Sequence, residues 1–247
     1  MRKARLIAPI VSAVLLASAC GGGDGSTPVD PTPSGPTARV RFFNATTGMT
    51  GSGGFTANGQ FASGSALASG QATPSCATVA AGPTSFGFGA ANAGGTGLGG
   101  SALATLDGQT LAAGGRYTVV ATGAATSPTL YLLDDGYTGT LPTNQAAVRF
   151  VNLAPGTGTT ANTFVAYMGA FGAGQSPVAV NIAVGTPTEF KPVAGGANTF
   201  SVVQVQGHSV VIPSGAATLQ PGTVNTLAIV QSASASAGFQ LVNVPGC

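Results

Sequence analysis

The residues that could carry out acid–base, nucleophilic or metal chemistry are few and scattered. The 247-residue sequence has one histidine, His208, and one glutamate, Glu189. A catalytic triad or a zinc site needs several partners close together, and zinc generally takes three or four nitrogen, sulfur or oxygen ligands. His208 follows Gln206 and Gly207, which is typical of a hairpin turn. We therefore predict an exposed turn histidine, no catalytic residue, no metal site and no cofactor.

Two further patterns resemble known sites but lack the surroundings those sites need. Asp134 and Asp135 are adjacent, so in a strand their carboxylates would point to opposite faces and could not act as a glycosidase pair. With Gly136 they indicate a turn at a strand end, and weak calcium binding is the alternative. Residues 95–100, GTGLGG, satisfy GxGxxG, but a dinucleotide site also needs a following helix and an acid about 20 residues on. No helical pattern follows and Asp107 comes too soon, which favours a loop.

Cys20 suggests a different chemistry, the attachment of lipid. A basic start (MRKAR), an apolar run over residues 6–16 and the small residues at 17–19 follow in the order of a secretory signal. The run is roughly half of the ~20 apolar residues that span a bilayer, so we do not expect a permanent membrane helix. Residues 16–20, LASAC, resemble the lipobox of bacterial lipoproteins. We predict a lipoprotein signal peptide over residues 1–19 and lipidation of Cys20; ordinary secretion with an incidental cysteine is the alternative.

The segment that follows this cysteine predicts a tether. Residues 21–36, GGGDGSTPVDPTPSGP, contain no apolar cluster that could offset the entropy lost on ordering. We expect a flexible Gly/Pro tether over residues 20–37. Several acyl chains on one cysteine would give stable anchoring, so the expected first partner is the membrane, through the lipid on Cys20.

Charge excludes one class of partner. The whole chain has 8 Lys and Arg against 6 Asp and Glu, a formal net charge of +2. Removal of the signal peptide removes three cations, so five remain against six acids and the net charge becomes −1. Five scattered cations do not form a phosphate-binding surface, and nucleic-acid binding is not expected.

The other two cysteines form an even pair. If lipid consumes Cys20, Cys76 and Cys247 remain in an oxidising compartment, where thiols are commonly bridged. Neither has a counterpart in the repeat described next. We predict a disulfide that fastens the end of the chain to its first half, with free or intermolecular thiols as the alternative.

An internal repeat organises the remaining sequence. Residues 38–44, ARVRFFN, return at 146–152 as AAVRFVN, and TLxxG at 110–114 returns at 218–222; both have an offset of 108. Between them, VAAG at residue 79 resembles VAGG at residue 193, and the segments 130–134 and 239–243 close the two copies alike. The sequence therefore predicts a tandem duplication.

The sequence of each copy is typical of β-strands. Val40 and Phe42 alternate with Arg39 and Arg41, a period of two with the cations expected to point outward. About seven short strands per hundred residues, with turn residues between them, fit a two-sheet sandwich. Phenylalanines at equivalent places are expected in the cores: Phe42, Phe86, Phe150 and Phe200. We predict an all-β chain with one β-sandwich over residues 38–136 and a second over residues 146–247.

These motifs carry a resemblance to a known family. The VRFxN start, the Val-Ala-Ala-Gly corner and the TLxxG turn resemble the bacterial domain of unknown function 4397. That resemblance implies immunoglobulin-like modules, single or in tandem, in exported proteins, and it supplies no catalytic residues. Residues 51–70 and 90–100 depart from the family pattern by being long and glycine-rich.

Together these features predict a non-enzymatic lipoprotein of the bacterial cell envelope, on its periplasmic or surface face. It would act as a structural or binding module for an envelope protein or glycan. Two alternatives remain: a carbohydrate-active or peptidoglycan-acting enzyme, and a glycan-binding module. The first lacks an acid–base set, and the second would normally show exposed tryptophans, of which the chain has none.

Overall fold

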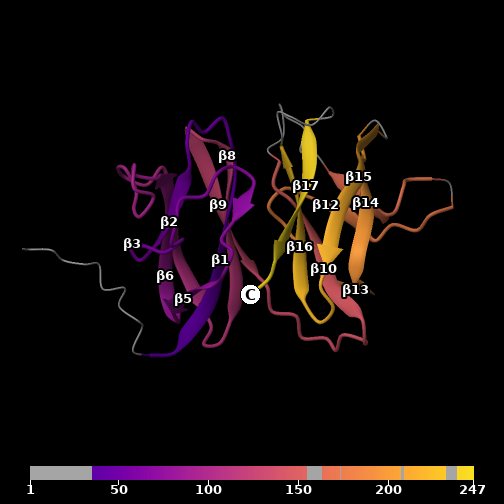
Figure 1. The fold of residues 1–247 in the computed structure, drawn as a ribbon, viewed down its shortest axis with the longest axis horizontal. Coiled ribbons are helices and arrows are strands. Elements are labelled where there is room, and N and C mark those ends of the chain that lie inside the picture. The colour runs from indigo at the N-terminus through magenta and orange to yellow at the C-terminus, as the bar shows by residue number, and fades with distance from the viewer. Residues whose placement is uncertain (1–34, 155–162, 173, 207–208, 232–237) are drawn as a thin grey trace, which may run out of the picture. The chain divides into compact units, whose positions relative to one another are not determined.

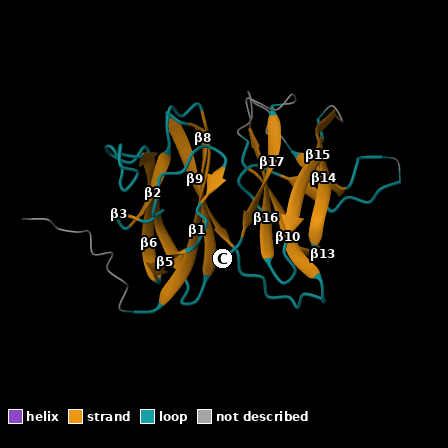
Figure 2. Ribbon diagram, in the orientation of Figure 1, coloured by secondary structure: helices purple, strands orange, loops and turns teal. Residues whose placement is uncertain are grey.

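A computed structural model describes residues 35–154, 163–172, 174–206, 209–231 and 238–247. Those residues form strands, turns and bends and no helix, which confirms the predicted all-β fold class (Figure 2). Within the same ranges there is no helix long and apolar enough to cross a membrane. The predicted signal peptide and Cys20 lie outside the described residues. Strand β1 begins at Thr37, which the sequence assigns to the end of the tether.

The described strands fall into two groups (Figure 1). The first repeat contains β1 (Thr37–Thr47), β2 (Gly53–Ala57), β3 (Gln60–Phe61), β4 (Gln71–Ala72), β5 (Ala77–Ala80), β6 (Gly82–Ala90), β7 (Ala104–Leu111), β8 (Arg116–Ala124) and β9 (Ser127–Asp134). The second repeat contains β10 (Gln145–Asn152), β11 (Phe164–Met168), β12 (Ala179–Ile182), β13 (Lys191–Ala194), β14 (Gly196–Gln204), β15 (Ser209–Leu219), β16 (Val224–Gln231) and β17 (Phe239–Pro245).

Each repeat builds two sheets from its own strands. The sheet that we call inner has the order β4-β1-β8-β9 in the first repeat, with β5 also paired to β1, and β13-β10-β16-β17 in the second. The sheet that we call outer has the order β3-β2-β6-β7 in the first repeat and β12-β11-β14-β15 in the second. The pairs β1–β8 and β10–β16 are parallel, and the other strand pairs are antiparallel.

An apolar core lies between the two sheets of each repeat, because alternate side chains of every strand point to one face. Phe42 of β1 meets Phe86 of β6 with ring centroids 6.3 Å apart, and Phe150 of β10 meets Phe200 of β14 at 5.6 Å. Both contacts are edge-to-face, a favourable geometry for aromatic pairs. All four rings are buried, so their predicted core positions are confirmed.

Strand register shows that the repeats correspond residue by residue. Arg41 lies opposite Thr118 in the first repeat, and Arg149 lies opposite Thr226 in the second. Both members of the pair are displaced by 108 positions, as the sequence predicts.

The closing strands correspond with a different offset. Leu130 lies opposite Ala121, and Leu241 lies opposite Ile229, the residue equivalent to Ala121. Leu130 therefore matches Leu241, an offset of 111, and not Phe239 as the sequence comparison suggested. The expected match was wrong because the chain between β16 and β17 is longer than the chain between β8 and β9. Both closing segments are apolar, so their sequences can be aligned in more than one way.

The TLxxG motif forms the same corner in both copies. Gly114 and Gly222 have φ values of 71° and 78°, in the left-handed region where a Cβ is disfavoured. This turn carries the chain from the outer sheet into β8 or β16 of the inner sheet.

A third apolar cluster joins the two repeats through their inner sheets. Phe43 and Val120 of the first repeat belong to it together with Val151, Leu153 and Val244 of the second. The sequence predicts strand cations that point outward, but it does not predict that two of them, Arg41 and Arg149, are covered by other parts of the chain. They point away from their own cores but are buried between the repeats.

Candidate functional site

The most strongly bonded charged group of the described chain is Arg149, in the middle of β10 and 3 % exposed. Its Nη2 donates to Oδ1 of Asp135 at 2.5 Å, and its Nη1 donates to the carbonyl oxygen of Asp134 at 2.5 Å. Its Nε donates to the hydroxyl oxygen of Thr226 at 2.9 Å. Asp135 is 2 % exposed, and its second oxygen accepts from the Thr118 hydroxyl at 2.7 Å. This network ties the end of the first repeat to the inner sheet of the second.

Burial dominates the electrostatics of this network. Burial raises the pKa of the Asp135 carboxyl, while the Arg149 guanidinium and the Thr118 hydroxyl oppose that rise. Burial also lowers the pKa of Arg149, and Asp135 opposes that change. Both pKa shifts disfavour the charged form, because water solvates an ion better than a protein interior does. The pair therefore acts mainly as a geometric lock between the repeats.

One aromatic ring covers the arginine, and a second ring packs on the first. The guanidinium carbon of Arg149 lies 4.6 Å from the ring centroid of Phe190, a cation–π distance. Phe190 in turn meets Tyr137 edge-to-face at 5.9 Å. Tyr137 belongs to the segment between β9 and β10 that connects the two repeats, so this segment is fixed against the second repeat.

The equivalent arginine of the first repeat forms no ion pair with any of the described residues. Arg41 is buried and donates to the carbonyl oxygen of Thr73, and its Nε has no partner in the described structure. The main-chain amide of Asp135 donates to the carbonyl oxygen of Arg116. The main-chain amide of Gly246 donates to the carbonyl oxygen of Val224, the residue 108 positions after Arg116. Gly246 therefore stands where a second aspartate would be.

This arrangement holds the repeats together and does not expose a proton donor or nucleophile to a ligand. Asp135 was missed as a joint residue in the sequence. The available signal is an arginine inside the apolar strand sequence AAVRFVN, which requires a counter-charge if the strand is buried. Asp134 behaves as predicted, since its Oδ1 accepts from the amide of Gly136 at 2.8 Å in a strand-end turn.

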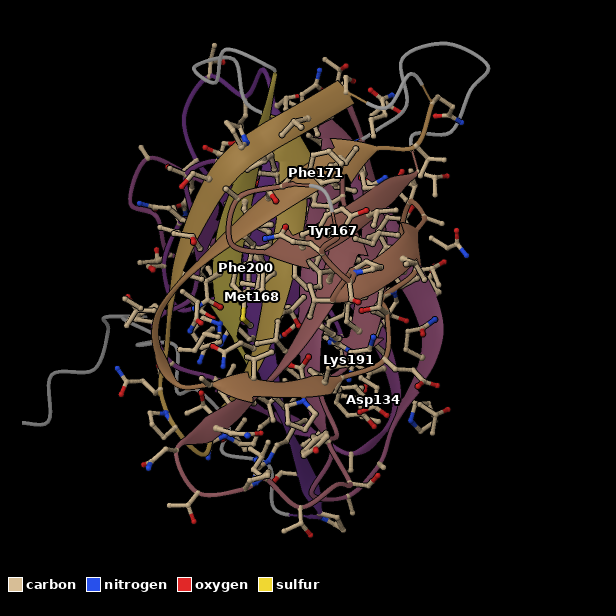
Figure 3. All side chains as sticks on the ribbon, turned by 90° about the vertical axis from the view of Figure 1, so that its right-hand side faces the viewer. Asp134, Tyr167, Met168, Phe171, Lys191 and Phe200 are labelled. Carbon is tan, nitrogen blue, oxygen red and sulfur yellow. A yellow bond between two sulfur atoms is a disulfide. The ribbon has the colours of Figure 1, made fainter. Side chains whose placement is uncertain are left out.

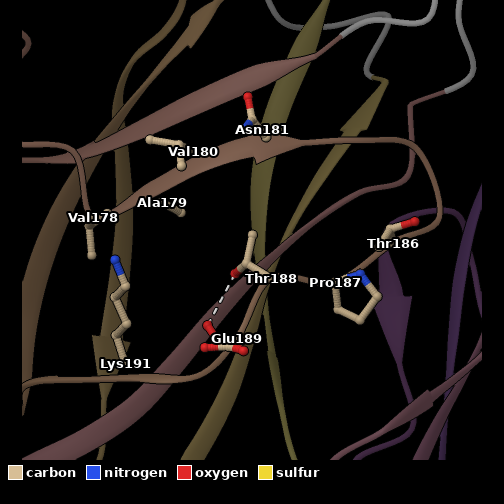
Figure 4. Close-up of a pocket in the computed structure, with 9 residues that line it drawn as sticks. All are labelled: Val178, Ala179, Val180, Asn181, Thr186, Pro187, Thr188, Glu189 and Lys191. Carbon is tan, nitrogen blue, oxygen red and sulfur yellow. Dashed lines mark hydrogen bonds between the residues drawn. The ribbon is translucent and has the colours of Figure 1, made fainter.

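A groove of about 250 Å³ opens at one edge of the second repeat (Figure 4). It lies between β12, an edge strand of the outer sheet, and the segment that leads into β13, an edge strand of the inner sheet. Its walls contain Val178, Val180 and Pro187, and it also holds Asn181, whose φ is 52°.

Two charged side chains line this groove. Glu189 is the sole glutamate of the chain, and Lys191 is the sole lysine beyond Lys3. Both are exposed, and among the described residues the only ion pair is the one between Arg149 and Asp135, so Glu189 and Lys191 do not pair with each other. These are the only two charged side chains among the groove-lining residues.

Exposed apolar side chains occur around the outer sheet of the second repeat. Tyr167 of β11 packs on Phe171 with ring centroids 4.9 Å apart, and Figure 3 shows both rings on the face turned to the viewer. Phe171 is 46 % exposed and Val180 is 52 % exposed. Met168, Val205 and Val210 are exposed as well.

The structure also shows where some of the other sequence patterns lie. Residues 95–100 lie in the loop between β6 and β7, and a strand follows this loop where a dinucleotide site would need a helix. His208 lies outside the described residues. Within the part of the chain that the structure describes, no three His, Cys, Asp or Glu side chains form a group that could hold a metal ion.

Cys76 and Cys247 are joined in the structure, with their sulfur atoms 2.16 Å apart and their Cα atoms 5.9 Å apart. The bridge connects the residue before β5 to the end of the chain after β17, a separation of 171 residues. It is therefore a second covalent link between the two repeats.

Comparison with known proteins gives a family. The family model described as domain of unknown function (DUF4397) matches residues 38–161, just over half of the chain. The chain belongs to this family. The match begins at β1 and continues past β10 into the second repeat. No curated protein matches the chain.

Proposed function

We propose that this protein is a non-catalytic lipoprotein of the bacterial cell envelope, anchored by lipid on Cys20, and that its two joined repeats act as a binding module. The border LASAC and the Gly/Pro segment after it support the anchor. The mature chain would reach the membrane at one end and carry the repeats at the other.

The observation that carries the binding role is the division of charged side chains. Asp135 and Arg149 are buried in the joint between the repeats, whereas Glu189 and Lys191 have no ion-pair partner among the described residues and face an open groove. A buried, paired charge keeps the two repeats in one arrangement, whereas an exposed charge without a partner can bind a ligand. Low overall charge leaves these two groups without competing neighbours among the groove-lining residues.

The alternatives find less support in the described chain. A glycan-hydrolysing enzyme needs two carboxyl groups about 5 to 9.5 Å apart across a substrate, and here the buried Asp135 is already bonded by Arg149 and Thr118. A glycan-binding module remains a candidate because the half-buried ring of Tyr167 and the exposed ring of Phe171 form an aromatic pair at the surface. Binding of soluble oligosaccharides that depends on these two rings would favour it.

The anchor is tested by replacing the thiol in the full chain. Cys20→Ser should move the protein from the membrane fraction to the soluble fraction and remove the acyl mass from its N-terminus. Ser18→Ala is the matched control, since it changes the same border and keeps the cysteine. Membrane association and mass that are unchanged in Cys20→Ser would contradict the proposal.

A further inference from the structure

We infer that the groove between β12 and β13 binds a short extended peptide that carries one acidic and one basic side chain two residues apart. This inference rests on the binding role proposed above and assigns it a place and a ligand class. The groove is bounded by edge strands of both sheets, as Figure 4 shows for β12 and the segment before β13.

The backbone at this edge is suited to a short partner. β12 pairs with β11 on one side and has no neighbouring strand on the other in the described sheet. A free edge offers main-chain donors and acceptors to an added strand. The three residue steps from Ala179 to Ile182 lie opposite two steps of β11, a bulge with Asn181 in the left-handed region. A bulge interrupts regular pairing, which limits an added strand to a few residues.

The charges of the groove have a defined spacing. Glu189 and Lys191 are two residues apart, about 6 to 7 Å in extended chain, and both line the groove. Phe190 between them points the other way, onto Arg149 and Tyr137. Because the buried joint fixes Phe190, the two charged side chains are held toward the groove. A peptide that runs antiparallel to this segment would place a base opposite Glu189 and an acid opposite Lys191.

The shared fold does not require these charges. In the first repeat Ala77 lies opposite Val40, and in the second Lys191 lies opposite Val148, the equivalent of Val40. Alanine therefore occupies the lysine position in the first repeat. Residues 71–77, QATPSCA, contain no charged residue at all. Charge at this edge is thus an addition of the second repeat.

The size of the groove agrees with a small ligand. Pockets for whole small molecules are roughly 300 to 1,000 Å³, and this groove is about 250 Å³ with Val178, Val180 and Pro187 as apolar walls. Such walls suit the aliphatic stems of the two charged side chains, which point to the same side of an extended peptide. A peptide of three residues with the two charges at its ends, and at its centre valine, which favours extended backbone, is therefore the simplest ligand that fits the groove.

The test uses the full chain in detergent micelles and two blocked peptides, acetyl-Glu-Val-Lys-amide and acetyl-Lys-Val-Glu-amide. We expect saturable methyl shifts at Val178 and Val180, with the first peptide binding more tightly because its charges match in antiparallel order. Lys191→Ala should weaken binding about 1.5- to 5-fold, the range for one exposed ion pair. Ala77 at the equivalent position makes this variant a safe one for folding.

The decisive variant exchanges the two charges. Glu189→Lys combined with Lys191→Glu should reverse the preference between the two peptides. The inference is overturned if neither peptide shifts these methyl groups at about 10 mM, the weak end of measurable affinity. It is also overturned if acetyl-Gln-Val-Gln-amide binds equally well or if the exchange leaves the preference unchanged. Membrane fractionation tests the lipid anchor on Cys20 separately from peptide binding. A failure of peptide binding can therefore be distinguished from a failure of the anchor.

Discussion

The two outer sheets have the same register but are covered in different ways. Cross-strand neighbours on the face away from the core are Gly54 with Gly89 and Thr56 with Gly87 in the first repeat, and Val165 with Val203 and Tyr167 with Ser201 in the second. In the first repeat a Cβ on Gly89 would lie 3.3 Å from the carbonyl oxygen of Ser101 and 3.5 Å from Leu98. The glycine-rich loop before β7 therefore lies directly on this sheet.

The second repeat covers its face with its own side chains. Tyr167 and Val203 stand where the first repeat has Thr56 and Gly89, and Phe171 packs on Tyr167. The result is a surface with exposed apolar groups in place of a loop. The repeats therefore share the core and the inner sheet, where they must fit each other, and differ on the outside, where the charged groove described above lies on the second repeat.

The first and largest test breaks the covalent link between the repeats. Replacing both cysteines, Cys76→Ser with Cys247→Ser, should lower the free energy of unfolding by about 5 kcal/mol, because the bridge closes a loop of 171 residues in the unfolded chain. Denaturant unfolding of the full chain measures the loss. Wild-type protein in excess reductant is the control and should match the double variant. Two reactive thiols in oxidised wild-type protein would show that the bridge is absent in solution.

The second test separates the two equivalent arginines. Arg149→Met leaves the Asp135 carboxylate buried without its partner and should cost about 3 to 5 kcal/mol in unfolding free energy. Arg41→Met removes a cation that has no ion-pair partner among the described residues and should cost about 1 kcal/mol. Denaturation midpoints at neutral pH check both values. Equal losses of unfolding free energy in the two variants would mean that the ion pair with Asp135 does not distinguish Arg149 from Arg41.

The third test gives the first repeat the outer residue of the second. Gly89→Val, the equivalent of Val203, should push the loop away from the sheet and cost about 1 to 3 kcal/mol. Limited proteolysis should then cut within residues 91–103 faster than in wild-type protein. Gly100→Ala in the same loop meets no atom within 4 Å and should stay within about 0.5 kcal/mol. Unchanged proteolysis in Gly89→Val would mean that the glycine face is not what seats the loop.

The smallest effect concerns pH. The pKa of Asp135 is raised in the folded protein, so the native state takes up this proton before the unfolded chain does. Its contribution to stability is therefore fully present below the ordinary carboxyl pKa and is lost as pH rises through the raised pKa. Compared with Asp135→Asn, wild-type protein should gain relative stability as pH falls through this window. Parallel pH profiles of the two proteins would contradict the direction of the shift. The second repeat has Gly246 at this place and adds no such dependence.

Much of the fold could be predicted from the sequence. The period-two alternation in residues 38–44 and 146–152 predicts strands, and the offset of 108 predicts that Arg41 and Arg149 share a register position. Phenylalanines at equivalent places predict the two cores. These features are local, because backbone geometry alone makes side chains alternate along a strand.

Tertiary structure alone decided what lies on the other face of those strands. Alternation identifies the residues that point away from the core, but whether they meet water or a second repeat depends on segments far along the chain. Phe43 is buried in a cluster that includes Val151 and Val244 of the second repeat, and Arg149 is buried beside the Asp135 carboxylate that neutralises it. Likewise, Glu189 and Lys191 look like an ordinary exposed pair until β12 forms the opposite wall of the groove. Burial of a charge is a property of the assembled interior, so no pattern within one strand could specify it.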